Sequence, residues 1–229
     1  MYNLFKIHKW EGNSSLKAFT LAEVLVVLAV IGVIASLTIP PVINNFQKKQ
    51  WETGYKRTYS ILEQATKMIM ADNGGTMKGL GLTSHGPLKE VYANQFKVTR
   101  LCNWGNHKGN CWHTDNDWTY LDGSAPYTGG VGIGFINNHV LMTYFLSSTD
   151  CASTYYDFPN ICGHVIFDTN GFKKPNVVGK DIHSILILKN SIIPYGVPGT
   201  GISIDTCKPG EYGTSCGLEI LKGVYDYEN

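Results

Sequence analysis

Apolar residues are distributed unevenly along the chain. From Val24 to Ile39 the sequence reads VLVVLAVIGVIASLTI, without a charged residue, and Glu23 is the single acid between Phe19 and this run. About 20 apolar residues in a helix span the hydrocarbon core of a bilayer. The apolar part of a cleaved secretory signal is shorter, about 7 to 15 residues, and ends at a small-residue cleavage site. The pattern therefore predicts a membrane-spanning helix near the N-terminus.

After Pro41 the spacing of apolar residues changes to that of an amphipathic helix. Large apolar side chains recur every three to five positions, and Asp72-Asn73-Gly74-Gly75 supplies a glycine stop. The apolar positions are Phe46, Trp51, Tyr55, Tyr59, Leu62, Ala65 and Ile69. A helix with one apolar face needs a partner that covers this face, so we expect the stripe to pack in the core of a folded domain.

The pattern changes again in the second half of the chain. Residues 75–130 are rich in Gly, Asn, Asp and aromatic residues without a sustained period, which predicts a long irregular connection. Residues 131–136 and 140–146 flank Asn137-Asn138-His139 and predict an antiparallel hairpin, in which an Asn takes a positive φ. Further strands are predicted at residues 164–167, 184–188 and 192–195. A long helix, a loop and then a sheet predict an α+β fold, with the helix laid across an antiparallel sheet.

Composition narrows the range of functions. The chain has 229 residues, a net charge of +1 and 16% charged residues, below the roughly 25% of an average soluble protein. No basic surface for nucleic acid is indicated, so no nucleic-acid partner is expected. No G-x-S-x-G, H-E-x-x-H or P-loop pattern occurs, and we expect no enzymatic activity.

All six cysteines follow the apolar run. They group as Cys102/Cys111, Cys151/Cys162 and Cys207/Cys216. An even number of cysteines after a membrane segment indicates an oxidising, extracytoplasmic compartment. Six cysteines allow many connectivities, and we prefer the three local pairs as structural disulfides. Zinc is the alternative for Cys102, His107, Cys111 and His113, although the spacing C-x4-H-x3-C-x-H is not a usual one.

The residues around the start of the apolar run resemble a processing signal. Lys17-Ala18-Phe19-Thr20-Leu21-Ala22-Glu23 follows a short basic leader and resembles the class III signal of type IV pilins and type II secretion pseudopilins. The resemblance implies that prepilin peptidase cuts between Ala18 and Phe19, and that the new N-terminus at Phe19 is N-methylated. Glu23 is then the fifth residue of the mature chain and pairs with the Phe19 amine of a neighbouring subunit. Ala18 stands where the family usually has Gly.

The resemblance also bears on the shape of the helix and on the end of the chain. In the family the long helix often loosens between a Gly and a Pro, which correspond here to Gly32 and Pro40. Since Pro40-Pro41 also removes backbone donors, we expect an interruption of the helix. Residues 215–227 resemble the short helix and final strand that close many pilin-like domains.

A polar turn between two predicted strands carries candidate metal ligands. The side-chain oxygens of Asp168, Asn170, Asn176 and Asp181 are of the kind that calcium prefers. The segment resembles a D-x-N-G turn and G-x-D segment of pilin-like domains, some of which bind calcium. Lysines in the same segment oppose a cation, so a hydrogen-bonded Asx-type turn is the preferred interpretation. We expect no cofactor, with calcium as the alternative.

Together these features predict three parts of the chain. Residues 1–18 form the leader, residues 19–41 the transmembrane and assembly half of the long helix, and residues 42–229 the amphipathic half with a β-rich head. The resemblance implies a structural subunit of a type IV pilus or a type II secretion pseudopilus. Such a subunit resides in the bacterial inner membrane before assembly and in a periplasmic or cell-surface filament afterwards. Its partners are prepilin peptidase, other pilin or pseudopilin subunits, an inner-membrane assembly platform and membrane lipid.

A second function remains open on the sequence. The aromatic-rich segment 102–127 is typical of a recognition loop. The alternative is therefore a membrane-anchored binding module, adhesin-like or a minor pilin, that recognises glycan or protein.

Overall fold

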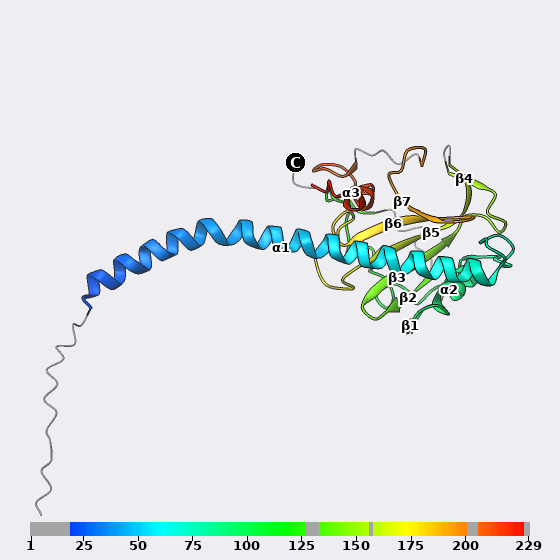
Figure 1. Cartoon of the computed structure of the whole chain (residues 1–229). Coiled ribbons are helices and arrows are strands. Elements are labelled where there is room, and N and C mark those ends of the chain that lie inside the picture. Colours follow the sequence, from blue (N-terminus) through cyan, green and yellow to red (C-terminus); the bar gives the residue numbers. More distant parts are fainter. Residues whose placement is uncertain (1–18, 127–132, 156–157, 201–205, 227–229) are drawn as a thin grey trace, which may run out of the picture. The chain divides into compact units, whose positions relative to one another are not determined.

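The computed structural model describes residues 19–126, 133–155, 158–200 and 206–226 (Figure 1). The chain forms two compact units, Met1–Phe46 and Gln47–Asn229, and each is described by itself. One helix, α1 (Leu21–Asp72), belongs to both units. We call the second unit the head.

The first unit contains the apolar half of α1. Its Leu, Ile, Val and Phe side chains point in all directions around the helix, and each of them is at least 45% exposed. None of the described residues of this unit is buried. By length and composition, this helix is able to cross a membrane.

The helix continues through Gly32 and Pro40–Pro41, where the sequence predicts an interruption. A proline lacks one backbone donor, but its ring holds φ near the helical value, so the dihedral angles need not change. Hydroxyl groups add bonds just before the prolines, since Ser36 Oγ donates to the Val33 carbonyl (2.8 Å) and Thr38 Oγ1 to the Ile34 carbonyl (3.0 Å). Such hydroxyls help apolar helices to tolerate proline.

The second half of α1 forms the centre of the head core. Its buried residues are Trp51, Tyr55, Thr58, Leu62, Ala65, Thr66 and Ile69. They pack against sheet residues that include Phe135, Tyr144, Val165, Phe167 and Ile185. The predicted stripe is thus largely present, but it begins at Trp51, because Phe46 is 62% exposed and lies in the first unit.

The sheet of the head is antiparallel and contains seven strands, hydrogen-bonded in the order β1-β2-β3-β5-β6-β7, with β4 beside β5. The strands are β1 (Val98–Leu101), β2 (Ile133–Asn137), β3 (Val140–Leu146), β4 (Ser153–Tyr155), β5 (Phe158–Asp168), β6 (Ile182–Leu188) and β7 (Ile192–Pro194). The predicted hairpin is β2–β3, and Asn138 in its turn has φ 61°. Residues 131 and 132, where this hairpin was expected to begin, lie outside the described residues.

Regular structure also occurs where the sequence predicts a loop. Helix α2 (His85–Ala93) packs beside β2 and β3, and β1 forms one edge of the sheet (Figure 1). The short helix expected near the C-terminus is α3 (Cys216–Lys222). Residues 223–226 form no strand, and the remainder of the expected final strand lies outside the described residues.

A layer of irregular chain covers part of the sheet face opposite α1. Trp112 and Trp118 from this layer pack against Leu141 and Phe145 of β3, in a cluster separate from the α1 core. Disulfides close three loops, Cys102–Cys111, Cys151–Cys162 and Cys207–Cys216. The predicted fold class, α+β with a long helix on an antiparallel sheet and disulfide-closed loops, is confirmed.

The contact between α3 and α1 provides a test of core packing. A Cβ atom at Gly217 would lie 2.6 Å from Tyr55 Oη and 2.8 Å from two Tyr55 ring carbons. Because Tyr55 is fully buried, its ring has no room to move away. We expect Gly217→Ala to lower the free energy of unfolding of the head by about 1 to 3 kcal/mol. Urea unfolding of the full chain in detergent, followed by tryptophan fluorescence, measures this change.

Gly86→Ala is the matched control. Gly86 also lies in a helix, but a Cβ atom there would meet only Ile133 Cδ1 at 3.4 Å and Ser84 Oγ at 3.8 Å. Since Ala favours the helix over Gly by up to about 1 kcal/mol, this variant should be neutral or slightly more stable. Equal stability of the two variants would contradict the tight Gly217–Tyr55 contact.

Candidate functional site

The first turn of α1 contains the residues implied in processing and assembly. Phe19 is 84% exposed, and Ala18 lies outside the described residues. Glu23 Oε2 accepts hydrogen bonds from the Thr20 backbone N–H (2.8 Å) and from Thr20 Oγ1 (2.9 Å), while the Glu23 N–H donates to Thr20 Oγ1 (3.2 Å). This reciprocal arrangement is a capping box. It places the Glu23 carboxylate at the positive end of the helix dipole.

The apolar half of α1 requires apolar surroundings. Exposed apolar side chains occupy the helix from Phe19 to Phe46, with Glu23 as the only charged residue among them. A helix that is apolar on all sides is stable within a membrane or among other helices, but not in water. The first unit therefore has an apolar surface that requires apolar surroundings.

The polar turn between β5 and β6 brings together all four predicted metal-ligand candidates. Asp168 Oδ1 accepts from the backbone N–H groups of Asn170 and Gly171, both at 2.9 Å. Asp181 accepts from Asn170 Nδ2 and the Asn176 N–H at 2.9 Å, and from the Val177 N–H at 2.7 Å. These contacts correspond to a hydrogen-bonded Asx-type turn.

The same turn has two unpaired oxygens. Asn170 Oδ1 and Asn176 Oδ1 are buried and have no hydrogen-bond partner among the described residues. The described part of the chain contains no group of three or more His, Cys, Asp or Glu residues arranged to hold a metal ion. Asp168 Oδ1 and both Asp181 oxygens accept from N–H donors, as a hydrogen-bonded turn requires.

A buried histidine reaches this turn from the irregular layer. His113 Nε2 lies 2.9 Å from Asp168 Oδ2, and both side chains are at most 1% exposed. Burial lowers the pKa of His113 to about 4. Burial raises the pKa of Asp168 well above its ordinary value, and the nearby Asp181 carboxyl raises it further. At neutral pH the imidazole is uncharged, so the contact is a hydrogen bond that holds residue 113 to the end of β5.

Sequence reasoning did not find this pair or a buried lysine, Lys89. The two members of the pair are 55 positions apart, and no local pattern connects them. Lys89 on α2 is fully buried, and burial lowers its pKa. Lys89 lies next to Leu88 and three positions before Tyr92, both of which are buried. This helical spacing is the only signal in the sequence for the burial of Lys89.

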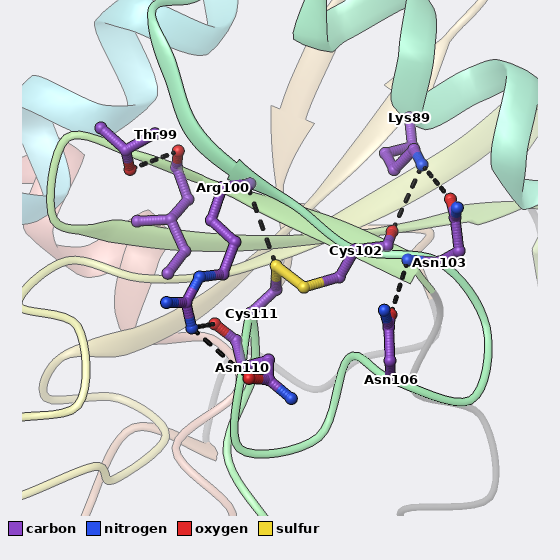
Figure 2. The surroundings of a disulfide bond; sticks show 9 residues. Lys89, Thr99, Arg100, Cys102, Asn103, Asn106, Asn110 and Cys111 are labelled. Atoms are coloured by element: carbon purple, nitrogen blue, oxygen red, sulfur yellow. Dashed lines mark hydrogen bonds between the residues drawn. A yellow bond between two sulfur atoms is a disulfide. The ribbon is translucent and has the colours of Figure 1, made fainter.

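Lys89 holds the start of the loop closed by Cys102–Cys111 (Figure 2). Its Nζ donates to the Cys102 carbonyl at 3.3 Å and to Asn103 Oδ1 at 2.9 Å. Figure 2 also shows Asn106 beneath Asn103, where Asn106 Oδ1 accepts from the Asn103 N–H at 2.9 Å. Because Cys102 and Cys111 are joined to each other, neither offers the thiolate that the zinc alternative requires.

The same loop displays an aromatic side chain. Trp51, Trp112 and Trp118 are buried, whereas Trp104 is 68% exposed. The Trp104 ring lies against His107, with the ring centroids 5.7 Å apart. The disulfide and Lys89 therefore fix a loop that presents Trp104 to solvent.

Comparison of the chain with protein-family models, curated proteins and solved structures returns no match. The functional class therefore rests on the architecture itself. An N-terminal apolar helix that continues into an α+β head, with an antiparallel sheet and three disulfides, is a pilin-like architecture. The apolar helix and the disulfides indicate a membrane-anchored, extracytoplasmic protein.

Buried histidines predict that the head loses stability in acid. Burial lowers the pKa of His183 to about 4, and its side chain packs against Tyr55 and Phe167. The unfolded chain binds a proton here below about pH 6.5, whereas the folded head does not until about pH 4. Stability contributed by the neutral imidazole is therefore present above pH 6.5 and is lost as the pH falls through this window. The expected loss is about 1.4 kcal/mol per pH unit.

His183→Phe isolates this contribution. The variant keeps a ring in the core but cannot bind a proton, so the slope of unfolding free energy against pH should decrease by about 1.4 kcal/mol per unit between about pH 6 and 4.5. Denaturant unfolding of the full chain at several pH values measures the slope. His139→Phe removes an exposed imidazole and is the control. A slope equal to that of the wild-type chain would contradict the assignment.

Proposed function

We propose that the protein is a structural subunit of a type IV pilus or type II secretion pseudopilus filament. The observation that carries this proposal is the division of α1. Its first half is apolar on all sides and exposed, and one face of its second half is buried in a disulfide-containing head. The processing motif at residues 17–23 lies at the start of the exposed half, as polymerisation through this helix requires.

Processing prepares the helix for assembly. Prepilin peptidase cleaves between Ala18 and Phe19 on the cytoplasmic side and removes a leader with three lysines. The cut frees the Phe19 amine close to the capping box of Thr20 and Glu23. In an apolar environment a lone amine or carboxylate is costly. Pairing of the Glu23 carboxylate with the Phe19 amine of a neighbouring subunit therefore lowers the free-energy cost of holding both charges there. The same pairing sets the stagger between subunits.

Packing of the helices supplies the rest of the assembly energy. The membrane holds the subunit until an inner-membrane platform, a partner of this protein, moves it into the filament. The apolar side chains from Leu21 to Phe46 then exchange contact with lipid for contact with neighbouring helices. The head faces outward, and its disulfides suit an extracytoplasmic position.

The exposed Trp104 favours a second candidate function. A large aromatic side chain on a rigid loop offers much contact area at a low cost in conformational entropy. A membrane-anchored module that recognises glycan or protein through this loop is the alternative. Both functions are compatible in a minor pilin that acts as an adhesin.

The mass and the N-terminal sequence of the protein from its own cells test processing. We expect a chain that starts at N-methylated Phe19, recovered in sheared surface polymers or in the periplasmic fraction. Reduction should increase its mass by six hydrogen atoms, two for each of the three disulfides. A chain that keeps residues 1–18 and stays in the membrane would contradict the filament proposal and favour the anchored binding module.

Glu23→Ala tests the assembly mechanism. The variant removes the partner of a neighbouring amine, and an unpaired charge in apolar surroundings costs several kcal/mol. We expect at least about a tenfold decrease in filament incorporation, with membrane insertion and head folding unchanged. Immunoblots of filament and membrane fractions measure this ratio.

Glu63→Ala is the control for Glu23→Ala. It removes a half-buried carboxylate from the head part of the same helix, where Glu63 Oε1 accepts from Lys67 Nζ at 2.8 Å. This variant should assemble normally. Normal incorporation of Glu23→Ala would exclude the amine–carboxylate mechanism.

A further inference from the structure

One end of the head is rich in positive charge. The segments 47–57, 169–181 and 217–226 carry eight cations against four carboxylates. The rest of the head carries eight cations against twelve carboxylates. The charges of the head are therefore separated, although the whole sequence is nearly neutral. We call the eight cations the basic end: Lys48, Lys49, Lys56, Arg57, Lys173, Lys174, Lys180 and Lys222.

Contacts join these three segments to each other. Lys48 Nζ lies 3.2 Å from Asp226 Oδ1, and Tyr225 Oη donates to the Gly179 carbonyl at 2.7 Å. Lys180 Nζ lies 5.4 Å from the centre of the Trp51 ring. In Figure 1, α3 lies near the part of α1 where the head begins.

The four carboxylates do not neutralise this surface. Asp181 is fully buried in the polar turn, and Asp226 is paired with Lys48. Glu52 and Glu219 are half-buried. By contrast, Lys49, Lys173 and Lys222 are exposed. Lys174 is also exposed, but its Nζ donates to the Asp117 carbonyl at 3.3 Å, and the exposed Asp117 carboxylate partly offsets its charge. The solvent-facing charge of the basic end is therefore positive.

Exposed apolar side chains lie between the lysines. Leu221 is 40% exposed and Val224 is 62% exposed, on either side of Lys222 in sequence, and Phe172 beside Lys173 is 47% exposed. Lysines alternating with exposed apolar residues are typical of surfaces that contact a membrane interface, because the apolar groups enter the headgroup layer while the ammonium groups stay at the phosphates.

We propose that the basic end binds anionic phospholipid headgroups while the subunit is held in the membrane. This inference rests on the proposed function, which places residues 19–46 in the bilayer. Gln47 follows that segment directly, so Lys48 and Lys49 leave the bilayer at the headgroups. Attraction to an anionic surface falls off within about 8 Å at physiological salt. The segments that contact Lys48 and Trp51 are tethered to the residues that follow the membrane segment, and their positive charge favours their contact with an anionic surface over that of the more acidic remainder of the head.

Lysine labelling of the full chain in lipid nanodiscs tests the proposal. An amine-reactive reagent is applied to discs of phosphatidylcholine alone and to discs that also contain phosphatidylglycerol, and peptide mass spectrometry gives the rate at each lysine. We expect Lys49, Lys173 and Lys222 to react several-fold more slowly in the anionic discs, and high salt to restore their rates. Lys78 and Lys97, exposed outside the basic end, should react equally in both discs.

A pair of double variants provides the matched control. Lys173→Glu with Lys222→Glu should abolish the protection of Lys49, whereas Lys78→Glu with Lys97→Glu should leave it intact. Equal rates in the two kinds of disc would overturn the proposal. Protection that follows the number of protein copies per disc, and not the lipid charge, would also overturn it and indicate contact with a second copy. A failure of the proposed function would be distinguishable, because the chain would then keep residues 1–18 or stay out of filaments, while insertion of its apolar helix into the discs and the labelling rates would be unaffected.

Discussion

The packing of one stripe of α1 on one face of the sheet is the constraint on which the head depends. Tyr55 and Leu62 are fully buried, and Ile69 is 3% exposed. Burying such a side chain stabilises a fold by roughly 1.5 to 3 kcal/mol. The stripe begins at Trp51, close to the start of the head at Gln47. The preceding turns of the same helix are apolar on every side. One continuous helix thus combines a folded domain with an element that requires lipid or other helices around it.

Covering one face of the sheet with α1 leaves the other face to irregular chain. A layer without regular structure has few backbone hydrogen bonds of its own, so specific contacts must hold it. The Cys102–Cys111 disulfide, the Lys89 ammonium and the His113–Asp168 hydrogen bond hold it at separate points. The result is a fixed loop that presents Trp104 to solvent.

The sequence predicts the elements whose signals are local. Strand β3 was predicted with its observed bounds, because a continuous apolar run follows a turn with Asn138 at positive φ. Helix α2 was missed because Gly86 and Pro87 look like loop residues, although proline is tolerated in the first turn of a helix. Strand β5 extends beyond its predicted range of residues 164–167, and its first residues include Pro159, a residue uncommon in strands.

The same difference between local and distant signals applies to the site. The N-terminal motif and the polar turn were found because their residues are adjacent in sequence, and the structure brings the four turn residues into one network. The buried state of Lys89 and the contact of His113 with Asp168 depend on tertiary packing. The roles of Ala18, Phe19 and Glu23 depend on other molecules and remain predictions.

The capping box shows how Glu23 is compatible with two interactions. Both Thr20 donors bind the same oxygen, Oε2. A carboxylate has about four lone-pair sites on two oxygens, so the proposed amine of a neighbouring subunit can bind Oε1 without displacing Thr20. Before assembly the cap holds the carboxylate at the helix end, and this reduces the entropy lost when the amine arrives. Thr20 therefore positions Glu23 through two uncharged donors, and the neighbouring amine supplies the positive charge that neutralises the Glu23 carboxylate.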